Sequence, residues 1–108
     1  MKHALTLVFF GVGLLSLGAC SSPDPVVGKE KAVVCQSCHG ADGNSTDPQF
    51  PRLAGQYEDY PVQALTDSRS GQRRNPIMSG FAVGLSDADI ANLAAYFARQ
   101  KNGVYDKR

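Results

Sequence analysis

The sequence predicts an all-α fold, and three observations support that prediction. No segment alternates apolar and polar residues in the way that a half-buried strand would. Apolar residues recur instead at helical spacings, three and four positions apart, in the segments 57–68 and 90–97. Residues that start helices precede two segments, with Asp24 before Pro25 and Ser86 before Asp89.

The first expected helix extends from Pro25 to about Cys38. Asp24 takes the N-cap position, and Pro25 takes the first helical position, where the missing N–H of proline costs nothing. A long loop is expected over residues 40–55, because they are rich in Gly, Asn, Asp and Pro and show no apolar periodicity. A structureless loop of that length in a compact domain is usually functional.

Two further helices are expected. The middle one covers residues 57–68, with Pro61 tolerated in its first turn. Residues 68–84 contain several glycines and Pro76 but no periodicity, so they are expected to form a second irregular segment. The last helix begins at a capping box of Ser86 and Asp89, and it ends with Lys101 in its last turn.

Composition narrows the classes of function. The chain of 108 residues is long enough for one small domain and too short for a multidomain enzyme. Removal of residues 1–19 would leave 10 Lys and Arg against 10 Asp and Glu, which excludes an electrostatic nucleic-acid binder. The chain has no Trp and only 5 Phe, so its core is short of large side chains. A covalently held apolar cofactor would offset that deficit.

Residues 1–19 are expected to form an export signal peptide. A mostly apolar run from Ala4 to Gly18 is shorter than the roughly 20 residues that span a bilayer. The segment ending at Cys20 resembles the bacterial lipoprotein box, which implies that Cys20 is lipidated and anchors the protein to a membrane. The alternatives are an uncleaved anchor, or an unmodified Cys20 beside an ordinary cleavage site.

Residues 20–25 are expected to be a lipidated linker, because they are small, polar and rich in proline. Ser21 behind Cys20 resembles the sorting pattern of outer-membrane lipoproteins, so the outer membrane is slightly favoured over the inner one. The expected location is therefore the periplasmic side, as an anchored lipoprotein, or as a soluble periplasmic protein if Cys20 is not lipidated.

Residues 35–39 have the C-x-x-C-H spacing of covalent haem attachment. Cys35 and Cys38 would lie on one face of a helix end and bond the vinyl groups of the porphyrin, with His39 beneath the ring as iron ligand. Three other interpretations compete. A thioredoxin-like redox pair lacks its βαβ pattern, a zinc site would have only His3 and Cys20 as further ligands, and a simple disulfide suits an exported protein.

Met78 is the expected second axial ligand of the iron. It is the one methionine that remains after removal of the signal peptide, which also takes away the second histidine. It lies in the segment predicted to be irregular, from which its thioether could reach the far face of the ring. Imidazole and thioether together raise the reduction potential of the iron. The alternative role for Met78 is that of a gap-filling core residue.

Residues 26–108 are expected to form one domain, and the part of it from about Val26 to Lys101 resembles a class I cytochrome c, and more narrowly one haem-binding half of the bacterial diheme respiratory cytochromes. The resemblance rests on Met78 and on four segments: CQSCHG at 35–40, PRLAGQY at 51–57, LSDADI at 85–90 and LAAYF at 93–97. It implies the cytochrome c fold of three to four helices around one covalently attached haem c. The chain differs from the diheme proteins in having one such domain.

The resemblance also implies roles for single residues. Pro51 matches the proline whose backbone carbonyl accepts the imidazole N–H, which would orient His39; a plain turn proline is the alternative. Gly28 and Tyr96 match the close-packing pair at the crossing of the first and last helices. Three residues before the ligand segment would either offset the haem propionates or remain solvated: Arg73, Arg74 and Asn75.

The sequence therefore predicts a monohaem one-electron carrier of a respiratory chain, not an enzyme. The expected partners are redox proteins, such as cytochrome complexes, a terminal oxidase or another reductase, together with a membrane through the lipid anchor; nucleic acid is not expected. The alternative is a haem enzyme or gas sensor with an open sixth coordination site, in which Met78 does not bind. A third possibility is a permanently docked subunit of a larger oxidoreductase.

Overall fold

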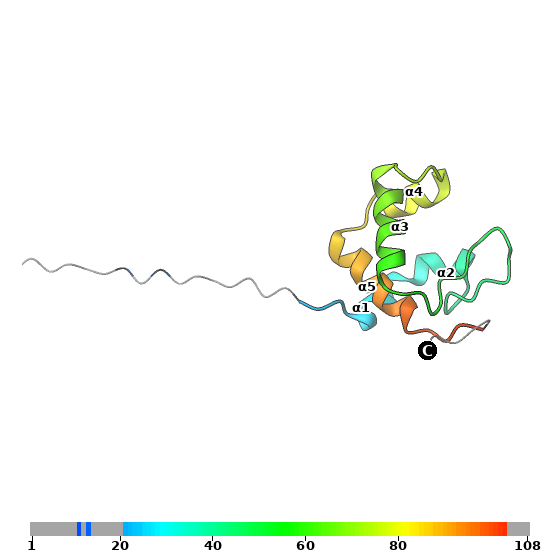
Figure 1. Ribbon diagram of the computed structural model, residues 1–108, viewed down its shortest axis with the longest axis horizontal. Helices are drawn as coiled ribbons and strands as arrows, with labels where there is room; N and C mark the ends of the chain where they lie inside the picture. The colour runs from blue at the N-terminus through cyan, green and yellow to red at the C-terminus, as the bar shows by residue number, and fades with distance from the viewer. Residues whose placement is uncertain (1–10, 12, 14–20, 104–108) are drawn as a thin grey trace, which may run out of the picture.

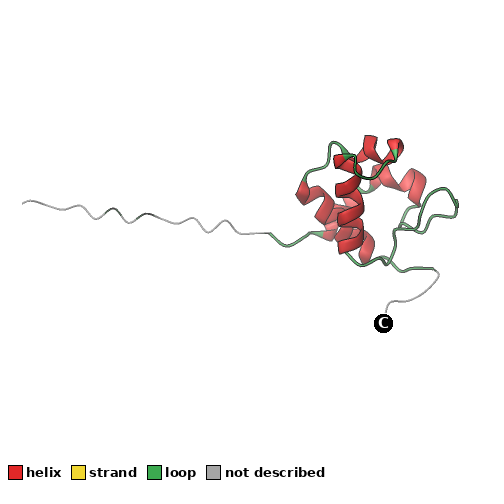
Figure 2. Ribbon diagram, turned by 45° about the horizontal axis from the view of Figure 1, so that its top comes forward, coloured by secondary structure: helices red, strands yellow, loops and turns green. Residues whose placement is uncertain are grey.

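Helices joined by turns and loops make up the computed structural model, which describes residues 11, 13 and 21–103 (Figure 1). No strand occurs in these residues, so the expected all-α class is confirmed (Figure 2). Cys20 and most of the predicted signal peptide lie outside the described residues. Of the helices described, none is long and apolar enough to cross a membrane. The five helices are α1 (Pro25–Lys31), α2 (Val33–His39), α3 (Asp59–Ser70), α4 (Pro76–Ala82) and α5 (Asp87–Ala98).

The first expected helix is divided into α1 and α2 by a turn at Ala32. As predicted, the Asp24 carboxylate caps α1 by accepting the backbone N–H of Val26 at 2.8 Å. At Ala32 the backbone ψ is −11°, and the N–H of Cys35 bonds the Ala32 carbonyl, which tightens the turn. The prediction of one continuous helix was therefore wrong, although the helical residues are nearly the same. The turn places the Ala32 side chain, which is fully buried, in the core.

The core lies where α1 crosses α5. Gly28 is buried at this crossing, and a Cβ atom built on it would lie 1.9 Å from the Asn92 carbonyl oxygen and 2.9 Å from the Cβ of Tyr96. The expected close packing of Gly28 and Tyr96 is thus confirmed. Around the crossing, the buried cluster consists of Ala32, Leu93, Tyr96 and Phe97. This cluster therefore holds the first helix, α1, against the last helix, α5.

The middle helix α3 covers Asp59–Ser70, two residues later than expected at each end. Pro61 is buried in its first turn as predicted, and Gly71 ends it with the positive φ of 81°. α3 packs against both α4 and α5 and therefore connects the segment around Met78 to the core. In Figure 1, α3 runs vertically, with α4 at the top and α1 below.

The segment 68–84 is not irregular throughout, because it contains helix α4. Asn75 takes the N-cap position and accepts the backbone N–H groups of Ile77 and Met78 at 3.1 and 3.2 Å, while Pro76 stands at the first helical position. Our prediction for this segment was wrong. Met78 therefore projects from a capped helix rather than from an irregular backbone.

The last helix begins as predicted but ends a turn early. Ser86 and Asp89 form the capping box, with Asp89 accepting the Ser86 N–H at 3.1 Å and Ser86 accepting the Asp89 N–H at 3.0 Å. The helix ends at Ala98, short of Lys101. The reason is tertiary: the Phe97 carbonyl accepts the N–H of Gly55 at 3.0 Å, so the chain leaves the helix to pair with the long loop.

Candidate functional site

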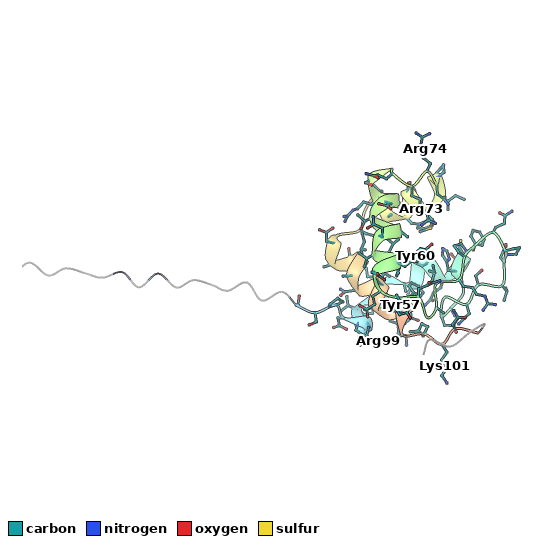
Figure 3. All side chains as sticks on the ribbon, in the orientation of Figure 1. Tyr57, Tyr60, Arg73, Arg74, Arg99 and Lys101 are labelled. Atoms are coloured by element: carbon teal, nitrogen blue, oxygen red, sulfur yellow. The ribbon has the colours of Figure 1, made fainter. Side chains whose placement is uncertain are left out.

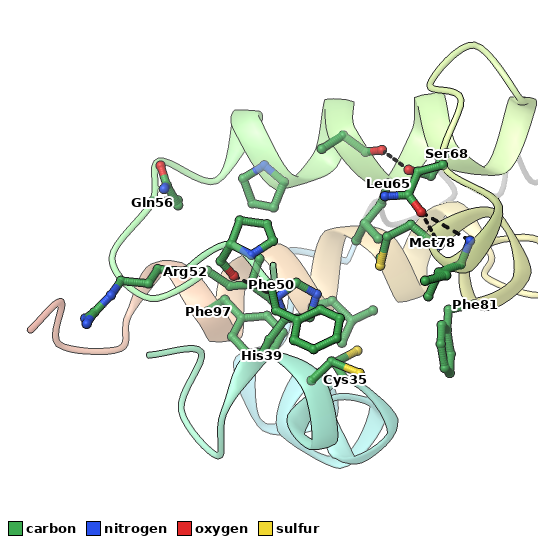
Figure 4. A pocket seen from close by; sticks show the side chains of 18 of the residues that line it. Cys35, His39, Phe50, Arg52, Gln56, Leu65, Ser68, Met78, Phe81 and Phe97 are labelled. Atoms are coloured by element: carbon green, nitrogen blue, oxygen red, sulfur yellow. Dashed lines mark hydrogen bonds between the residues drawn. The ribbon is translucent and has the colours of Figure 1, made fainter. Parts of the chain in front are cut away.

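A cavity of about 420 Å³ opens between α2, the long loop and the pair α3 and α4. Apolar side chains that line it include Leu65 of α3 and Phe97 of α5 (Figure 4). Leu93 of α5 is a further apolar lining residue. The residues of the haem-attachment motif and Met78 line the same cavity. The sequence predicted five residues to hold the haem and a sixth to be lipidated, and the structure brings the five together: Cys35, Cys38, His39, Pro51 and Met78. The sixth, Cys20, lies outside the described residues.

His39 ends α2 and is held by one short contact. Its side chain is 5% exposed, and its Nδ1 lies 2.7 Å from the backbone carbonyl oxygen of Pro51. A carbonyl can only accept, so Nδ1 carries the hydrogen and the lone pair of the imidazole is on Nε2. Phe50 contacts the ring edge-on at a centroid distance of 6.2 Å. The ring is therefore fixed in a tautomer whose Nε2 is available to a metal.

Cys35 and Cys38 lie in the last turns of α2, three residues apart, and are free thiols. Burial raises the pKa of the Cys35 thiol, and the neighbouring Cys38 adds to the increase. A thioredoxin-like pair requires the opposite, because its nucleophilic thiolate depends on a lowered pKa. The raised pKa of Cys35 therefore gives no support to the redox-pair interpretation.

A separate point concerns the zinc interpretation. Among the described residues, no cluster of three or more His, Cys, Asp or Glu side chains could hold a metal ion.

Met78 lines the cavity from α4. Figure 4 shows its sulfur pointing into the cavity, toward the side on which His39 lies. The Asn75 cap and the packing of α4 against α3 fix the position of this helix relative to the core. A thioether on one wall and an imidazole nitrogen on another thus converge on one apolar space.

Backbone hydrogen bonds connect the two ends of the long loop that carries Pro51. The Gly43 carbonyl accepts the N–H groups of Leu53 and Ala54 at 2.8 and 3.1 Å. Gly43 has a φ of +82°, and a Cβ there would lie 2.8 Å from the Phe97 ring and 2.9 Å from the Ala54 nitrogen. Only glycine combines a positive φ with the lack of a Cβ atom that this position requires. The two hydrogen bonds to the Gly43 carbonyl fix Leu53, and with it Pro51 two residues earlier, next to the His39 imidazole.

Asn44 connects the same loop to the segment that follows α5. Its Nδ2 donates to the Lys101 carbonyl at 2.8 Å, and its Oδ1 accepts the Gly103 N–H at 3.1 Å and the Arg52 guanidinium at 3.3 Å. The sequence analysis missed this residue. The sequence contains no signal for this role of Asn44, because asparagine is common in any Gly- and Asp-rich turn, whether or not it makes distant contacts.

Of the three residues considered for the haem propionates, the structure places two at the cavity. Arg73 and Asn75 line it, whereas Arg74 does not, and Figure 3 shows Arg74 pointing away from the molecule. Arg52, which the sequence analysis did not single out, also lines the cavity. Both arginines are exposed, and no carboxylate is among the lining residues.

Comparison with known proteins identifies the family. Residues 28–101 match the family model of cytochrome c. The chain belongs to the cytochrome c family. Cytochrome c4 of Pseudomonas aeruginosa is 45% identical to this chain, in an alignment that covers 96% of this chain and 51% of the relative. Cytochrome c-554(548) of Halomonas halodenitrificans is 40% identical, in an alignment that covers 72% of this chain and 98% of the relative. The chain thus spans about half the length of its cytochrome c4 relatives.

Solved structures agree with this assignment. The crystal structure of reduced recombinant cytochrome c4 from Pseudomonas stutzeri superposes with a TM-score of 0.73 at 41% identity, covering 77% of this chain and 48% of that one. The expected resemblance to one part of the cytochromes c4 is thereby confirmed. A further relative, from Stutzerimonas stutzeri strain A1501, is named a thiosulfate dehydrogenase electron acceptor; it is 46% identical over 59% of this chain and 30% of its own length.

As a member of the cytochrome c family with one C-x-x-C-H motif, the chain binds haem c covalently. The donor set of the cavity fits that group. Two free thiols, a tautomerically fixed imidazole and one thioether face an apolar space, which is the chemistry that a covalently attached, six-coordinate haem requires. The expected cofactor is therefore confirmed, while the assignment of the axial ligands to His39 and Met78 remains a prediction.

Proposed function

We propose that this cytochrome c is a one-electron carrier with His39 and Met78 as axial ligands. The observation that carries the proposal is the convergence of the His39 ring, fixed by Pro51, and the Met78 side chain on one apolar cavity. When bound, haem supplies an iron that alternates between the ferric and ferrous states. With both ligands retained in both states, no substrate bond changes and an enzymatic role is not expected.

Each side chain at the site has a distinct task in this proposal. The Pro51 carbonyl accepts the His39 Nδ1–H, which orients the ring and makes Nε2 a stronger donor. The apolar lining residues exclude water, and the thioether of Met78 favours the reduced state, so both raise the reduction potential. Arg73, which lines the cavity, would offset the negative charge of the haem propionates.

Carbon monoxide binding tests the proposal against its main alternative. The reduced protein is expected to show a reversible one-electron wave on an electrode and to leave carbon monoxide unbound, because Met78 occupies the sixth position. Met78→Ala should bind carbon monoxide while keeping the haem attached through Cys35 and Cys38. Binding of carbon monoxide by the unmodified chain would show an open site, and the haem enzyme or gas sensor would become the better interpretation.

The location and partners are also proposals. The apolar run before Cys20 supports export, and the lipoprotein-like box supports an anchor on the periplasmic side, with the domain held off the membrane by the linker 20–25. The partners would be redox proteins of a respiratory chain. A relative named as the electron acceptor of a thiosulfate dehydrogenase supports this class of partner.

A further inference from the structure

Helix α4, which carries Met78, depends on its neighbours for its position. It has 7 residues, and a helix that short does not persist on its own in water. Among the described helices, it packs against α3 alone. Before α4 begins, the Asp67 carbonyl of α3 accepts the Arg73 N–H at 3.0 Å, which fixes the point of entry. The position of α4 therefore also depends on how the chain is held where it leaves this helix.

The Arg69 side chain holds the chain at that point. Arg69 lies in the last turn of α3, and its Nη1 donates to the Leu85 backbone carbonyl at 3.0 Å. Its Nη2 lies 2.6 Å from the Asp87 carboxylate. The Arg69 side chain is 28% exposed, whereas that of Asp87 is 91% exposed. An ion pair with so exposed a partner contributes little, so the charge-assisted bond to the Leu85 carbonyl is the stronger restraint.

Backbone hydrogen bonds connect Leu85 to the helical turn of Met78. The Leu85 N–H donates to the Ala82 carbonyl at 3.0 Å. The Val83 N–H donates to the carbonyl of Ser79, the residue that follows Met78, also at 3.0 Å. Because these bonds make one rigid unit of the helix and its exit, a displacement of Leu85 moves Met78 with the whole of α4.

We propose that Arg69 is a positioning residue for the axial ligand: its bond to the Leu85 carbonyl keeps α4 against α3 and thereby keeps the Met78 thioether at the iron. This inference rests on the proposed ligation of the haem iron by Met78. Without the Arg69 bond, α4 should move away from the cavity more often, and Met78 should leave the iron more readily. The buried cluster at the crossing of α1 and α5 does not include Arg69, so the domain should stay folded.

Imidazole competition in the oxidised, haem-loaded protein measures this opening. Added imidazole binds the iron only in molecules whose Met78 has left it, so its apparent affinity is proportional to the population of that open state. The titration is followed by the loss of the methionine-to-iron charge-transfer band. Arg69→Ala should raise the apparent affinity for imidazole about tenfold, because the bond from a charged donor to the Leu85 carbonyl is lost.

Arg99→Ala is the matched control. Like Arg69, Arg99 donates to one backbone carbonyl, that of Ala95 at 2.8 Å, and pairs with one carboxylate, that of Glu58 at 3.2 Å. These partners belong to α5 and to the N-cap of α3, away from the residues that follow α4. Arg99→Ala should therefore lose about as much stability toward denaturant as Arg69→Ala but leave the apparent imidazole affinity near that of the unmodified chain.

Asp87→Asn separates the two contacts of Arg69. It weakens the exposed ion pair but leaves the bond to the Leu85 carbonyl in place. The apparent imidazole affinity should therefore stay within about twofold of that of the unmodified chain. A rise as large as that of Arg69→Ala would assign the effect to the ion pair and contradict the role of the Leu85 carbonyl.

The inference is overturned if Arg69→Ala binds imidazole as the unmodified chain does, or if Arg99→Ala raises the affinity equally. If Arg69→Ala does not retain its haem, Arg69→Gln takes its place, with a rise expected and a lack of effect counting against the inference. A missing charge-transfer band in the unmodified chain would refute ligation by Met78 itself. A band that is present but unaffected by the Arg69 variants would leave the proposed function standing.

Discussion

Gly28→Ala is expected to destabilise the protein, although alanine is the better helix former. In an open helix the change would stabilise by about 1 kcal/mol. At Gly28, however, the new Cβ would lie 1.9 Å from the Asn92 carbonyl oxygen, whereas real Cβ atoms stay beyond 3.0 Å. The obstructing atom is backbone of α5, so the two helices must separate by about 1 Å.

That separation opens the core cluster of Ala32, Leu93, Tyr96 and Phe97, which lies at the crossing. Overpacking of this kind costs about 3 kcal/mol or more, so the net loss after the gain in helix propensity is about 2 kcal/mol. In a domain of this size, such a loss lowers the melting temperature by about 8–16 °C. Circular dichroism during thermal and denaturant unfolding of the haem-loaded protein measures both quantities.

Gly80→Ala is the matched control. Gly80 is in α4, its φ is not positive, and a Cβ there would meet nothing within 4 Å. The same substitution should therefore stabilise the protein by about 0.5–1 kcal/mol. The reasoning fails if Gly28→Ala is as stable as the unmodified chain, or if the two variants shift stability in the same direction.

Three further outcomes are expected. Asp89→Ala should cost about 1 kcal/mol at pH 7, measured by circular dichroism during unfolding, through loss of the capping box with Ser86. The bond from the Ser86 backbone lowers the pKa of Asp89, with Lys31 adding to the effect, so this stabilisation is present above about pH 4 and disappears as the pH falls through the folded-state pKa. Gly43→Ala should cost about 2 kcal/mol or more in denaturant unfolding, because its positive φ and the nearby Ala54 nitrogen both exclude a Cβ. Cys20→Ser should move the exported, processed protein from the membrane fraction to the soluble one; protein that stays bound would contradict the lipid anchor.

Local signals predicted much of this structure. The haem-attachment motif needs no tertiary information, because its five residues are consecutive and lie at one helix end. The capping residues Asp24 and Ser86 likewise act within three residues of themselves. The contact between Gly28 and Tyr96 is different, because no local signal predicts it. That prediction came from the resemblance to the cytochrome family.

Helix α4 was missed, yet the signal for it is present in the sequence. Asn75 and Pro76 form the same pair of N-cap and first helical residue as Asp24 and Pro25. The glycine within α4 and the short length of the helix concealed its apolar periodicity. Recognition of the repeated pair would have placed Met78 on a helix.

Tertiary hydrogen bonds account for the remaining differences. The early end of α5 depends on the bond between Gly55 and the Phe97 carbonyl, 42 residues apart in the chain. The Asn44 contacts with Lys101 and Gly103 connect segments that are still further apart, by 57 and 59 residues. Such pairings cannot be deduced from propensity, because each partner is an ordinary loop or helix-end residue when considered alone.

The optical spectrum of the haem-loaded chain, extended into the near infrared, tests the central claim most directly. Coordination by His39 and Met78 predicts low-spin bands in both oxidation states and, in the oxidised protein, the weak methionine-to-iron charge-transfer band. Met78→Ala should abolish that band while leaving the haem covalently attached. A high-spin spectrum of the unmodified chain, or a charge-transfer band that persists in Met78→Ala, would contradict the account.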